Sequence, residues 1–271
     1  MLKTALRYPG GKSKAIKKLQ EFTGIDFLEY REPFIGGGSL FIYLKQLFPQ
    51  RQFWINDLNQ DVYYFWKIAQ RENEKLVNRI YNYKEVNSDG RALFKSLLEL
   101  DLAKLNPLER AARFFVLNRI SFSGTTESGG YSESAFQRRF TDSSIERVAK
   151  LAEILDERVQ ITNHDYSELL TNDSEIINSK ILVYLDPPYY AASKSKLYGK
   201  KGNLHTMFDH MNFANKVLDC KLNWFVSYDN SEYVRNNFKK AKLHEWEFQY
   251  GMNNYNKKTC ETGKELIISN F

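Results

Sequence analysis

Short apolar segments alternate with amphipathic, helix-like segments along much of the chain. The clearest apolar run, residues 181–185, reads Ile-Leu-Val-Tyr-Leu and predicts a buried parallel strand. Because helical stretches separate several of the strand patterns, the sequence predicts an α/β protein with a doubly wound sheet. The other strand candidates are residues 28–33, 52–55, 159–163, 223–227 and 266–269.

The pattern changes twice along the chain. From residue 70 to residue 156 it becomes helical and charged, as in residues 109–118, and a polar loop at residues 121–134 interrupts it. Strand patterns occur on both sides of this segment. We therefore expect a discontinuous α/β domain, formed by residues 1–69 and 157–271, with a mainly helical domain inserted at residues 70–156.

Composition limits the class of protein. The chain has 271 residues, of which 42% are hydrophobic and 15% aromatic, and this is enough for a substantial core. The net charge of +6 suits a polyanionic partner and equally suits a solvated basic surface. Cys220 and Cys260 form neither a disulfide framework nor a metal-ligand spacing, so we expect a cytoplasmic protein. We expect no signal sequence and no membrane span.

The motif Asp186-Pro187-Pro188-Tyr189 directly follows the clearest strand. It should therefore lie at the carboxyl end of that strand, where open α/β sheets bind ligands. The two prolines make the backbone rigid between an acidic acceptor and an aromatic ring. This arrangement suits a planar, amino-bearing base, and a simple turn between strand and helix is the alternative.

A glycine-rich turn follows an earlier strand candidate. Gly36-Gly37-Gly38 opens a helical run, and glycine lets the backbone approach a ligand near the free N–H groups of a helix. Asp57 follows about 20 residues later, where nucleotide-binding folds place a carboxylate for ribose hydroxyls. A helix cap is the alternative role for Asp57. Together the two features predict a nucleoside-containing cofactor, and a dinucleotide is disfavoured because Gly-x-Gly-x-x-Gly is absent.

Residues 7–12, 34–38, 56–57, 118–119 and 186–189 carry motifs in a characteristic order. In this order they resemble the DNA adenine-N6 methyltransferases of the Dam type. The cofactor motif comes first, then target recognition and then the catalytic motif, as in the alpha class of that family. The resemblance spans nearly the whole chain. It implies a Rossmann-like methyltransferase sheet with an inserted target-recognition domain, S-adenosylmethionine as methyl donor and adenine in double-stranded DNA as acceptor.

The resemblance also implies the residues around the cofactor. Phe34, Gly36 and Gly38 match the motif that contacts its methionine half, and Asp57 matches the acid that binds its ribose. Asp165 occupies the place of an acidic residue near the cofactor's adenine. The remaining cofactor-binding residues that the resemblance implies are Arg7, Tyr8, Lys12 and Asp186. The expected product is S-adenosylhomocysteine.

The chemistry suits the residues independently. The exocyclic amine of a purine is a poor nucleophile, because its lone pair is delocalised into the ring. Hydrogen bonds to the Asp186 carboxylate and the Pro187 carbonyl would favour a pyramidal nitrogen, and transfer would then be direct and in line. Flipping the base out of the duplex costs a few kcal/mol, and stacking on Tyr189 returns roughly 1–3 kcal/mol. The reaction requires neither a cysteine nucleophile nor a metal.

The inserted segment contains the residues expected to contact DNA. Asn118-Arg119 resembles the family's entry into its recognition hairpin, and residues 125–134 are expected to read the DNA. The basic segment 193–202 is expected to be a flap that neutralises the DNA backbone, with an exposed loop as the alternative. The hairpin pattern of the GATC-specific members is absent, so the methylated site stays open. The expected DNA contacts are Lys12, Asn118, Arg119, Ser123, Arg138, Arg139 and Lys194.

The sequence is compatible with two other functions. A cytosine-N4 methyltransferase would use the same amine chemistry, although that group more often has serine at the position of Asp186. A catalytically inactive DNA-binding regulator would keep the fold without the reaction. The expected partner is double-stranded DNA, a separately acting cognate restriction endonuclease is compatible with the sequence, and a monomer or weak dimer is the expected state.

Overall fold

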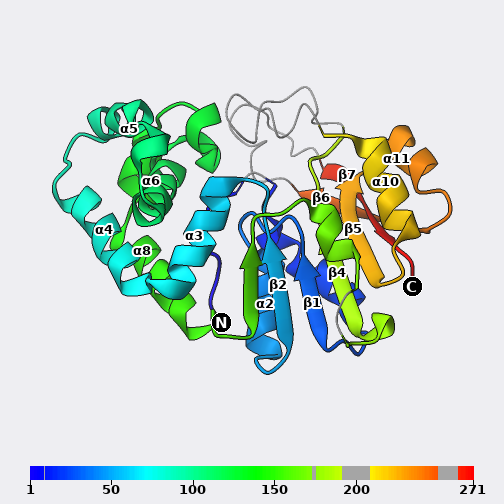
Figure 1. The fold of residues 1–271 in the computed structure, drawn as a ribbon. Coiled ribbons are helices and arrows are strands. Elements are labelled where there is room, and N and C mark those ends of the chain that lie inside the picture. Colours follow the sequence, from blue (N-terminus) through cyan, green and yellow to red (C-terminus); the bar gives the residue numbers. More distant parts are fainter. Residues whose placement is uncertain (9, 173–174, 191–207, 250–261) are drawn as a thin grey trace.

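The computed structural model describes residues 1–8, 10–172, 175–190, 208–249 and 262–271. Within these residues, seven strands form one sheet. The strands are β1 (Glu29–Glu32), β2 (Gln52–Asn56), β3 (Val159–Thr162), β4 (Ile181–Leu185), β5 (Asn223–Asp229), β6 (Lys242–Gln249) and β7 (Thr262–Ser269). Their order across the sheet is β3-β2-β1-β4-β5-β7-β6 (Figure 1).

The sheet confirms the doubly wound α/β fold. Five neighbouring strands, β3, β2, β1, β4 and β5, are parallel to one another, and β7 runs antiparallel between β5 and β6. The strand order reverses between β1 and β4, and ligands bind at such switch points, beyond the carboxyl ends of the strands. The sequence did not indicate β6, because this edge strand carries charged residues among its apolar ones, as edge strands commonly do.

Helices flank the sheet on several sides (Figure 1). The helices α4 to α8 gather beyond β3, at the left of the view, whereas α10 and α11 lie beside β5. The α-helices are α1 (Ile16–Leu19), α2 (Ser39–Leu47), α3 (Gln60–Arg71), α4 (Asn73–Glu85), α5 (Gly90–Glu99), α6 (Pro107–Ile120), α7 (Glu133–Arg139), α8 (Asp142–Ala149), α10 (His210–Asp219) and α11 (Glu232–Asn237). No helix in these described ranges is both long and apolar enough to cross a membrane.

Short 3₁₀ helices connect many of these elements. They are η1 (Lys12–Lys14), η2 (Gln20–Phe22), η3 (Leu102–Lys104), η4 (Phe122–Gly124), η5 (Thr126–Ser128), η6 (Lys150–Glu153), η7 (Tyr166–Leu170) and η8 (Asn178–Lys180). The helix starts follow local chemistry: the Asn106 side chain accepts the Glu109 N–H at 2.9 Å, and Pro107 occupies the first turn of α6. The expected helical character of residues 109–118 is therefore confirmed.

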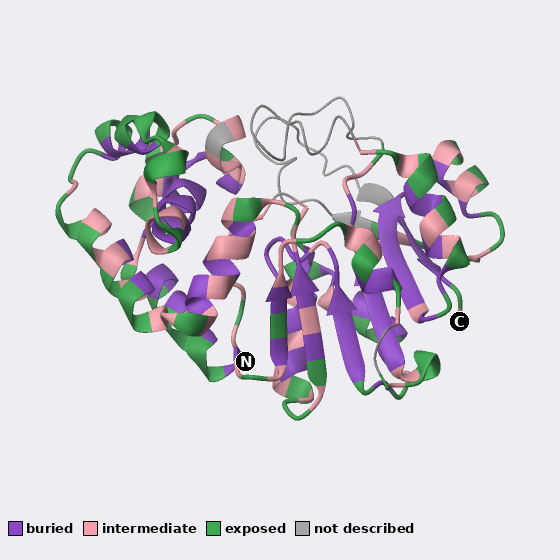
Figure 2. Ribbon diagram, in the orientation of Figure 1, coloured by how far each residue is buried: buried purple, intermediate pink, exposed green. Residues whose placement is uncertain are grey.

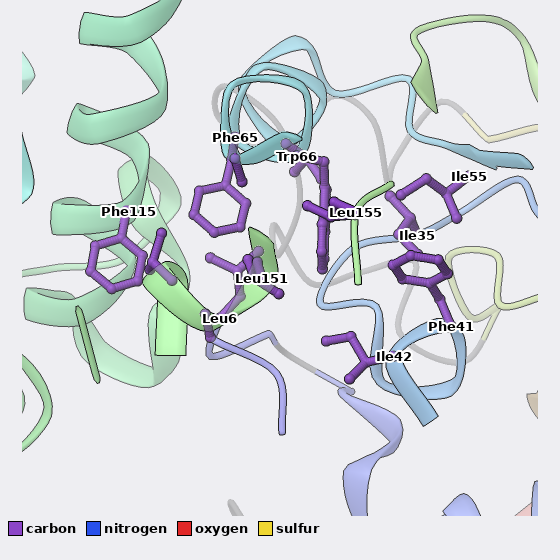
Figure 3. Packing of buried hydrophobic residues seen from close by; sticks show 14 of the residues in the cluster. Leu6, Ile35, Phe41, Ile42, Ile55, Phe65, Trp66, Phe115, Leu151 and Leu155 are labelled. Carbon is purple, nitrogen blue, oxygen red and sulfur yellow. The ribbon is translucent and has the colours of Figure 1, made fainter. Parts of the chain in front are cut away.

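Of the two hydrophobic clusters in the described residues, one lies around β4, β5 and α10, and the other continues from the sheet into the helical region. Figure 3 shows Leu6, Phe65, Trp66, Phe115 and Leu151 within this cluster, although they come from widely separated segments. The central strands β1, β4 and β5 are mostly buried, and the outer helix faces are exposed (Figure 2). The helix α3, which crosses the expected boundary at residue 69, packs into this shared core. The domain boundaries near residues 69 and 157 therefore stay predictions.

Candidate active site

Asp186 follows β4 directly, at the carboxyl edge of the sheet. The Nζ of Lys12 lies 2.7 Å from its Oδ1 and 2.8 Å from its Oδ2, and it also donates to the Gly10 carbonyl at 3.0 Å. The Ser227 hydroxyl donates to Oδ1 of Asp186 at 2.8 Å. The carboxylate is thus held by an amino-terminal cation and by a hydroxyl from β5.

The ring of Tyr189 lies beside this carboxylate pair. The Nζ of Lys12 stands 4.9 Å from the Tyr189 ring centroid, within the range of a cation–π contact. The Tyr228 ring centroid is 5.8 Å from that of Tyr189. Pro187, which follows Asp186 in the chain, is buried. The structure therefore brings Lys12, Asp186 and Tyr189 together, as expected for a site at the end of this strand.

The glycine turn between β1 and α2 is shaped by two aromatic side chains. Gly36 has a φ of 42°, and a Cβ there would lie 2.7 Å from Cε1 of Tyr8. Gly38 has a φ of 63°, and its Cβ would lie 2.6 Å from Cζ2 of Trp66. Positive φ angles and this close packing both favour glycine. The turn therefore places the Tyr8 ring directly against the backbone of the expected cofactor motif.

Asp57 stands next to the same turn. Its Oδ2 accepts the Gly36 N–H at 3.0 Å, and its Oδ1 accepts the Asn59 N–H at 2.9 Å. The N-cap of α3 is Asn59, whose side chain accepts the Asp61 N–H at 3.0 Å, so Asp57 is not the helix cap. Burial raises the pKa of Asp57 to about 6. A carboxylate has more acceptor positions than these two hydrogen bonds use, so it can receive further donors.

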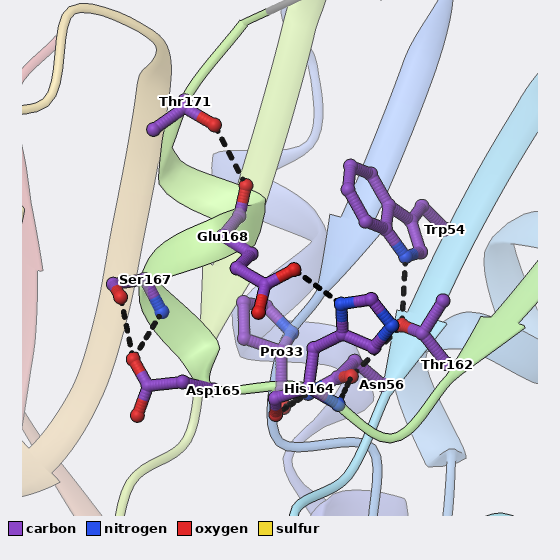
Figure 4. A network of polar contacts seen from close by, with 9 residues as sticks. All are labelled: Pro33, Trp54, Asn56, Thr162, His164, Asp165, Ser167, Glu168 and Thr171. Carbon is purple, nitrogen blue, oxygen red and sulfur yellow. Dashed lines mark hydrogen bonds and ion pairs between the residues drawn. The ribbon is translucent and has the colours of Figure 1, made fainter.

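Asn56 connects the carboxyl ends of three strands (Figure 4). Its Nδ2 donates to the carbonyls of Pro33 and His164 at 3.1 and 3.0 Å, and its Oδ1 accepts from Thr162 and from the His164 N–H, both at 2.8 Å. This buried amide fixes the peptide before Phe34 relative to the loop that carries Asp165. The sequence suggested no role for Asn56 beyond its membership of the motif.

Phe34 contacts the segment that carries Asp165. The Phe34 ring stacks on the Tyr166 ring with a centroid separation of 5.5 Å. Asp165 is half exposed, and it caps η7 by accepting the Ser167 N–H at 3.0 Å. The Nζ of Lys216 lies 3.9 Å from Oδ1 of Asp165. The residues expected around the cofactor therefore border one region, beyond the ends of β1, β2, β3 and β4.

A buried acid, Glu32, is the last residue of β1, shortly before the glycine turn in the chain. Tyr30 donates its hydroxyl to Oε2 of Glu32 at 2.7 Å, and the Phe41 N–H donates to the same oxygen at 3.1 Å. Burial, with a further contribution from the negative charge of Asp186, raises the pKa of Glu32 to about 8. Sequence reasoning gave Glu32 no role, although it directly precedes the Pro33-Phe34 part of the cofactor motif.

Asn118 and Arg119 are buried at the end of α6 instead of facing solvent. Asn118 accepts the Arg7 N–H at 2.9 Å and donates to the carbonyls of Arg7 and, at 3.0 Å, of Gly124. Arg119 donates to the Ala5 carbonyl. Ser123, in the following η4, has a φ of 54°. The two side chains of the Asn-Arg motif thus hold the amino-terminal segment against the entry to the expected DNA-reading loop.

Arg119 belongs to a group of arginines that we call the arginine cluster: Arg7, Arg119, Arg139 and Arg147. Burial, followed by the positive charges of the other three members, lowers the pKa of Arg119 to about 9. Burial and the charge of Arg139 also lower the pKa of Arg7. Among the described residues, no carboxylate forms an ion pair with a member of this cluster. Arg138 is exposed beside it, and Lys194 lies outside the described residues.

The sequence that forms this site matches a known enzyme family. Residues 8–252 match the D12 class N6 adenine-specific DNA methyltransferase family. The chain belongs to this family. The match covers the glycine turn, the buried Asn-Arg motif and the Asp186 motif, and members of a methyltransferase family use S-adenosylmethionine as methyl donor in general.

Curated relatives agree with the family assignment. The Type II methyltransferase M1.LlaDCHI of Lactococcus lactis subsp. cremoris is 24% identical, over 100% of this chain and 96% of its own length. The Type II methyltransferase M.MjaIII of Methanocaldococcus jannaschii is 23% identical, over 73% of this chain and 72% of its own length. The modification methylase StsI of Streptococcus sanguinis is 23% identical, over 100% of this chain and 43% of its own length. The expected adenine-specific DNA methyltransferase is confirmed, and cytosine-N4 chemistry is disfavoured.

Proposed function

We propose that this adenine methyltransferase receives its target base in a clamp formed by Asp186, Pro187 and Tyr189. The observation that carries the proposal is the position of the Lys12 ammonium. It donates N–H groups to both oxygens of Asp186 and lies over the Tyr189 ring. An adenine that stacks on Tyr189 and donates its amine to Asp186 would use the same ring and the same acceptor, so the site suits an N–H donor beside a flat ring.

Methylation at this clamp depends on the acceptors around the amine. Two hydrogen bonds, to the Asp186 carboxylate and the Pro187 carbonyl, direct the nitrogen lone pair away from the acceptors. The carboxylate also stabilises the positive charge that develops on the nitrogen, and it accepts the proton that leaves. Since the amine lies inside a stacked duplex, the adenine has to be flipped out to reach Tyr189.

The residues around the glycine turn fit S-adenosylmethionine, which supplies the methyl group on a sulfonium. Asp57 is the acceptor for the ribose hydroxyls, because it is buried, acidic and has unused acceptor positions. The negative charge of Asp186 suits the positive sulfonium. The wall of the cofactor site is formed by Phe34, Tyr8 and the backbone of Gly36 and Gly38. Asp165 is the acid proposed to lie near the adenine of S-adenosylmethionine. Arg7 and Lys12 belong to the amino-terminal wall.

The DNA backbone is proposed to lie over the arginine cluster. Four arginines without carboxylate partners among the described residues make a site that favours phosphate groups. The Asn118 side chain holds the Arg7 backbone and Arg119 holds the Ala5 carbonyl, while Arg139 and the neighbouring Arg138 reach the surface. Ser123 and residues 125–134 form the proposed reading loop, and Lys12, once the base has displaced it from Asp186, contacts the DNA.

The proposal extends to the cellular context. We propose that the enzyme acts on the DNA of the cytoplasm as a monomer or weak dimer, and that a cognate endonuclease, where one exists, acts separately. The names of the relatives support a place in restriction and modification.

Sequencing of DNA from cells that express the chain, with detection of modified bases, tests this function. The expected result is N6-methyladenine confined to one sequence context, and its absence in cells that express Asp186→Ala. The finding of N4-methylcytosine, or of no modified base with wild-type protein, would contradict the proposal.

A further inference from the structure

The two oxygens of Asp186 have different surroundings. Oδ1 accepts hydrogen bonds from Lys12 at 2.7 Å and from Ser227 at 2.8 Å. Oδ2 accepts from Lys12 at 2.8 Å, and no other donor to it occurs among the described residues. An incoming amine can therefore replace Lys12 at Oδ2, whereas Oδ1 keeps its hydroxyl partner throughout.

The hydroxyl that binds Oδ1 is itself held by a tyrosine. The hydroxyl oxygens of Tyr184 and Ser227 are 2.9 Å apart. Ser227 has a single hydroxyl proton, and a carboxylate paired with an ammonium group only accepts, so this proton points to Asp186. Tyr184 must then be the donor to Ser227. Burial and the negative charge of Asp186 raise the pKa of Tyr184 well above its ordinary value, so its hydroxyl stays protonated.

This chain of donors is built on rigid elements. Tyr184 pairs with Phe225 and Leu185 with Val226 in the parallel β4–β5 ladder, and the next step along both strands sets Asp186 beside Ser227. Ser227 and Tyr184 are 0% and 1% exposed. The Tyr184 ring stacks on the Phe225 ring at 4.8 Å. Side chains on packed strands hold a reacting group more accurately than side chains on loops.

We propose that Ser227, oriented by Tyr184, is a positioning residue for methyl transfer. Its hydroxyl holds Oδ1 of Asp186, so that Oδ2 stays directed at the adenine amine after Lys12 has moved away. This inference rests on the proposed role of Asp186 and adds two residues that touch neither adenine nor cofactor. The carboxyl group can otherwise rotate about its Cβ–Cγ bond, and small errors in geometry reduce the rate of an in-line transfer.

The inference is tested with Ser227→Ala and Tyr184→Phe in a single-turnover methylation assay on duplex DNA, with N6-methyladenine quantified by mass spectrometry. Ser227→Ala should lower the transfer rate by about ten- to a hundredfold, because a hydrogen bond to a charged group is lost. Tyr184→Phe, which removes only the orienting donor, should lower the rate by about three- to tenfold. The dissociation constants for S-adenosylmethionine and for DNA should stay at wild-type values in both variants.

Ser269→Ala is the matched control. Ser269 is a fully buried serine of the same sheet, but its hydroxyl donates to the Phe271 carbonyl at 2.9 Å and not to the site. This variant should transfer methyl groups at the wild-type rate.

Three results would overturn the inference: a wild-type rate in folded Ser227→Ala, equal losses in Ser227→Ala and Ser269→Ala, or a loss in Ser227→Ala that appears only as weaker cofactor or DNA binding. Failure of the proposed function itself is distinguishable, because the wild-type protein would then form no N6-methyladenine in the same assay.

Discussion

Lys12 and Asp186 are 174 residues apart in sequence, yet the Nζ of Lys12 is within 2.8 Å of both carboxylate oxygens of Asp186. Lys12 is 6% exposed and Asp186 is 22% exposed, so the ammonium is largely shielded from water and the carboxylate is partly shielded. In such surroundings an ammonium and a carboxylate depend on each other, because either one alone would be a buried charge without compensation. Entry of the target base therefore has to supply new donors to Asp186 as Lys12 moves away.

The first prediction concerns the carboxylate itself. Asp186→Asn keeps an oxygen acceptor but removes the negative charge, and it should lower methyl transfer by at least about a hundredfold, as removal of a key electrostatic group does elsewhere. Cofactor binding, measured by calorimetry, should be largely retained. Thermal unfolding of the variant is the control, because Lys12 loses its charge partner. Turnover at the wild-type rate would remove Asp186 from its proposed role.

The second prediction follows from the raised pKa of Asp57, which is about 6. Ribose hydroxyls should bind the ionised carboxylate, so the affinity for S-adenosylmethionine should rise as the pH passes through about 6 and level off at higher pH. Asp57→Asn should weaken binding at neutral pH by about ten- to a hundredfold and abolish the pH dependence. Calorimetric titrations from about pH 5 to pH 8 measure both effects. An unchanged affinity in the variant would return Asp57 to a structural role.

The third prediction concerns Glu32, whose pKa is raised to about 8. A raised carboxyl pKa means that this group favours the folded state at low pH, and that its contribution is lost as the pH rises towards about 8, by up to about 1.4 kcal/mol per pH unit. Glu32→Gln removes this titration. The variant should therefore gain free energy of unfolding relative to wild type between about pH 5 and pH 8. Denaturant unfolding at several pH values measures it, and parallel curves for the two proteins would refute it.

The fourth prediction concerns the arginine cluster. Arg139→Gln and Arg147→Gln should each weaken DNA binding and reduce the dependence of log affinity on log salt concentration by about one unit, as expected for the loss of one phosphate contact. Lys104→Gln, which removes one charge from an 83% exposed side chain outside the cluster, should leave that slope unchanged. Fluorescence anisotropy with a short duplex gives the slopes. Equal slopes for all three variants would exclude the cluster as the phosphate site.

Local signals in the sequence were sufficient for part of this site. The Asp186 motif was predictable because rigid prolines follow an uninterrupted apolar strand, and the glycine turn because it joins a strand to a helix. The role of Ser227 was not predictable, since a serine within an apolar strand forms no motif. Only the pairing of β4 with β5 places it beside Asp186.

The Asn-Arg motif is the opposite case. The family resemblance implied contacts of Asn118 and Arg119 with DNA, and the structure places both side chains in the interior, 0% and 3% exposed. The residues before them, 111–117, are almost all apolar, and a helix that is apolar on all sides is buried. That pattern could have indicated that Asn118 and Arg119 are buried and form hydrogen bonds within the protein. The Asn118 amide binds Arg7, a residue whose position no local pattern in the sequence could give.

The packing of Trp66 against the glycine turn has a consequence for selectivity. Its ring meets Gly38, its indole N–H donates to the Gly36 carbonyl at 3.0 Å, and its neighbour Phe65 stacks on Phe115 of α6. One helix therefore connects the wall of the proposed methyl-donor site with the helix that leads into the proposed reading loop. These packed rings fix the distance between the methyl-donor site and the reading loop. The choice of one adenine within a recognition sequence therefore depends partly on this distance.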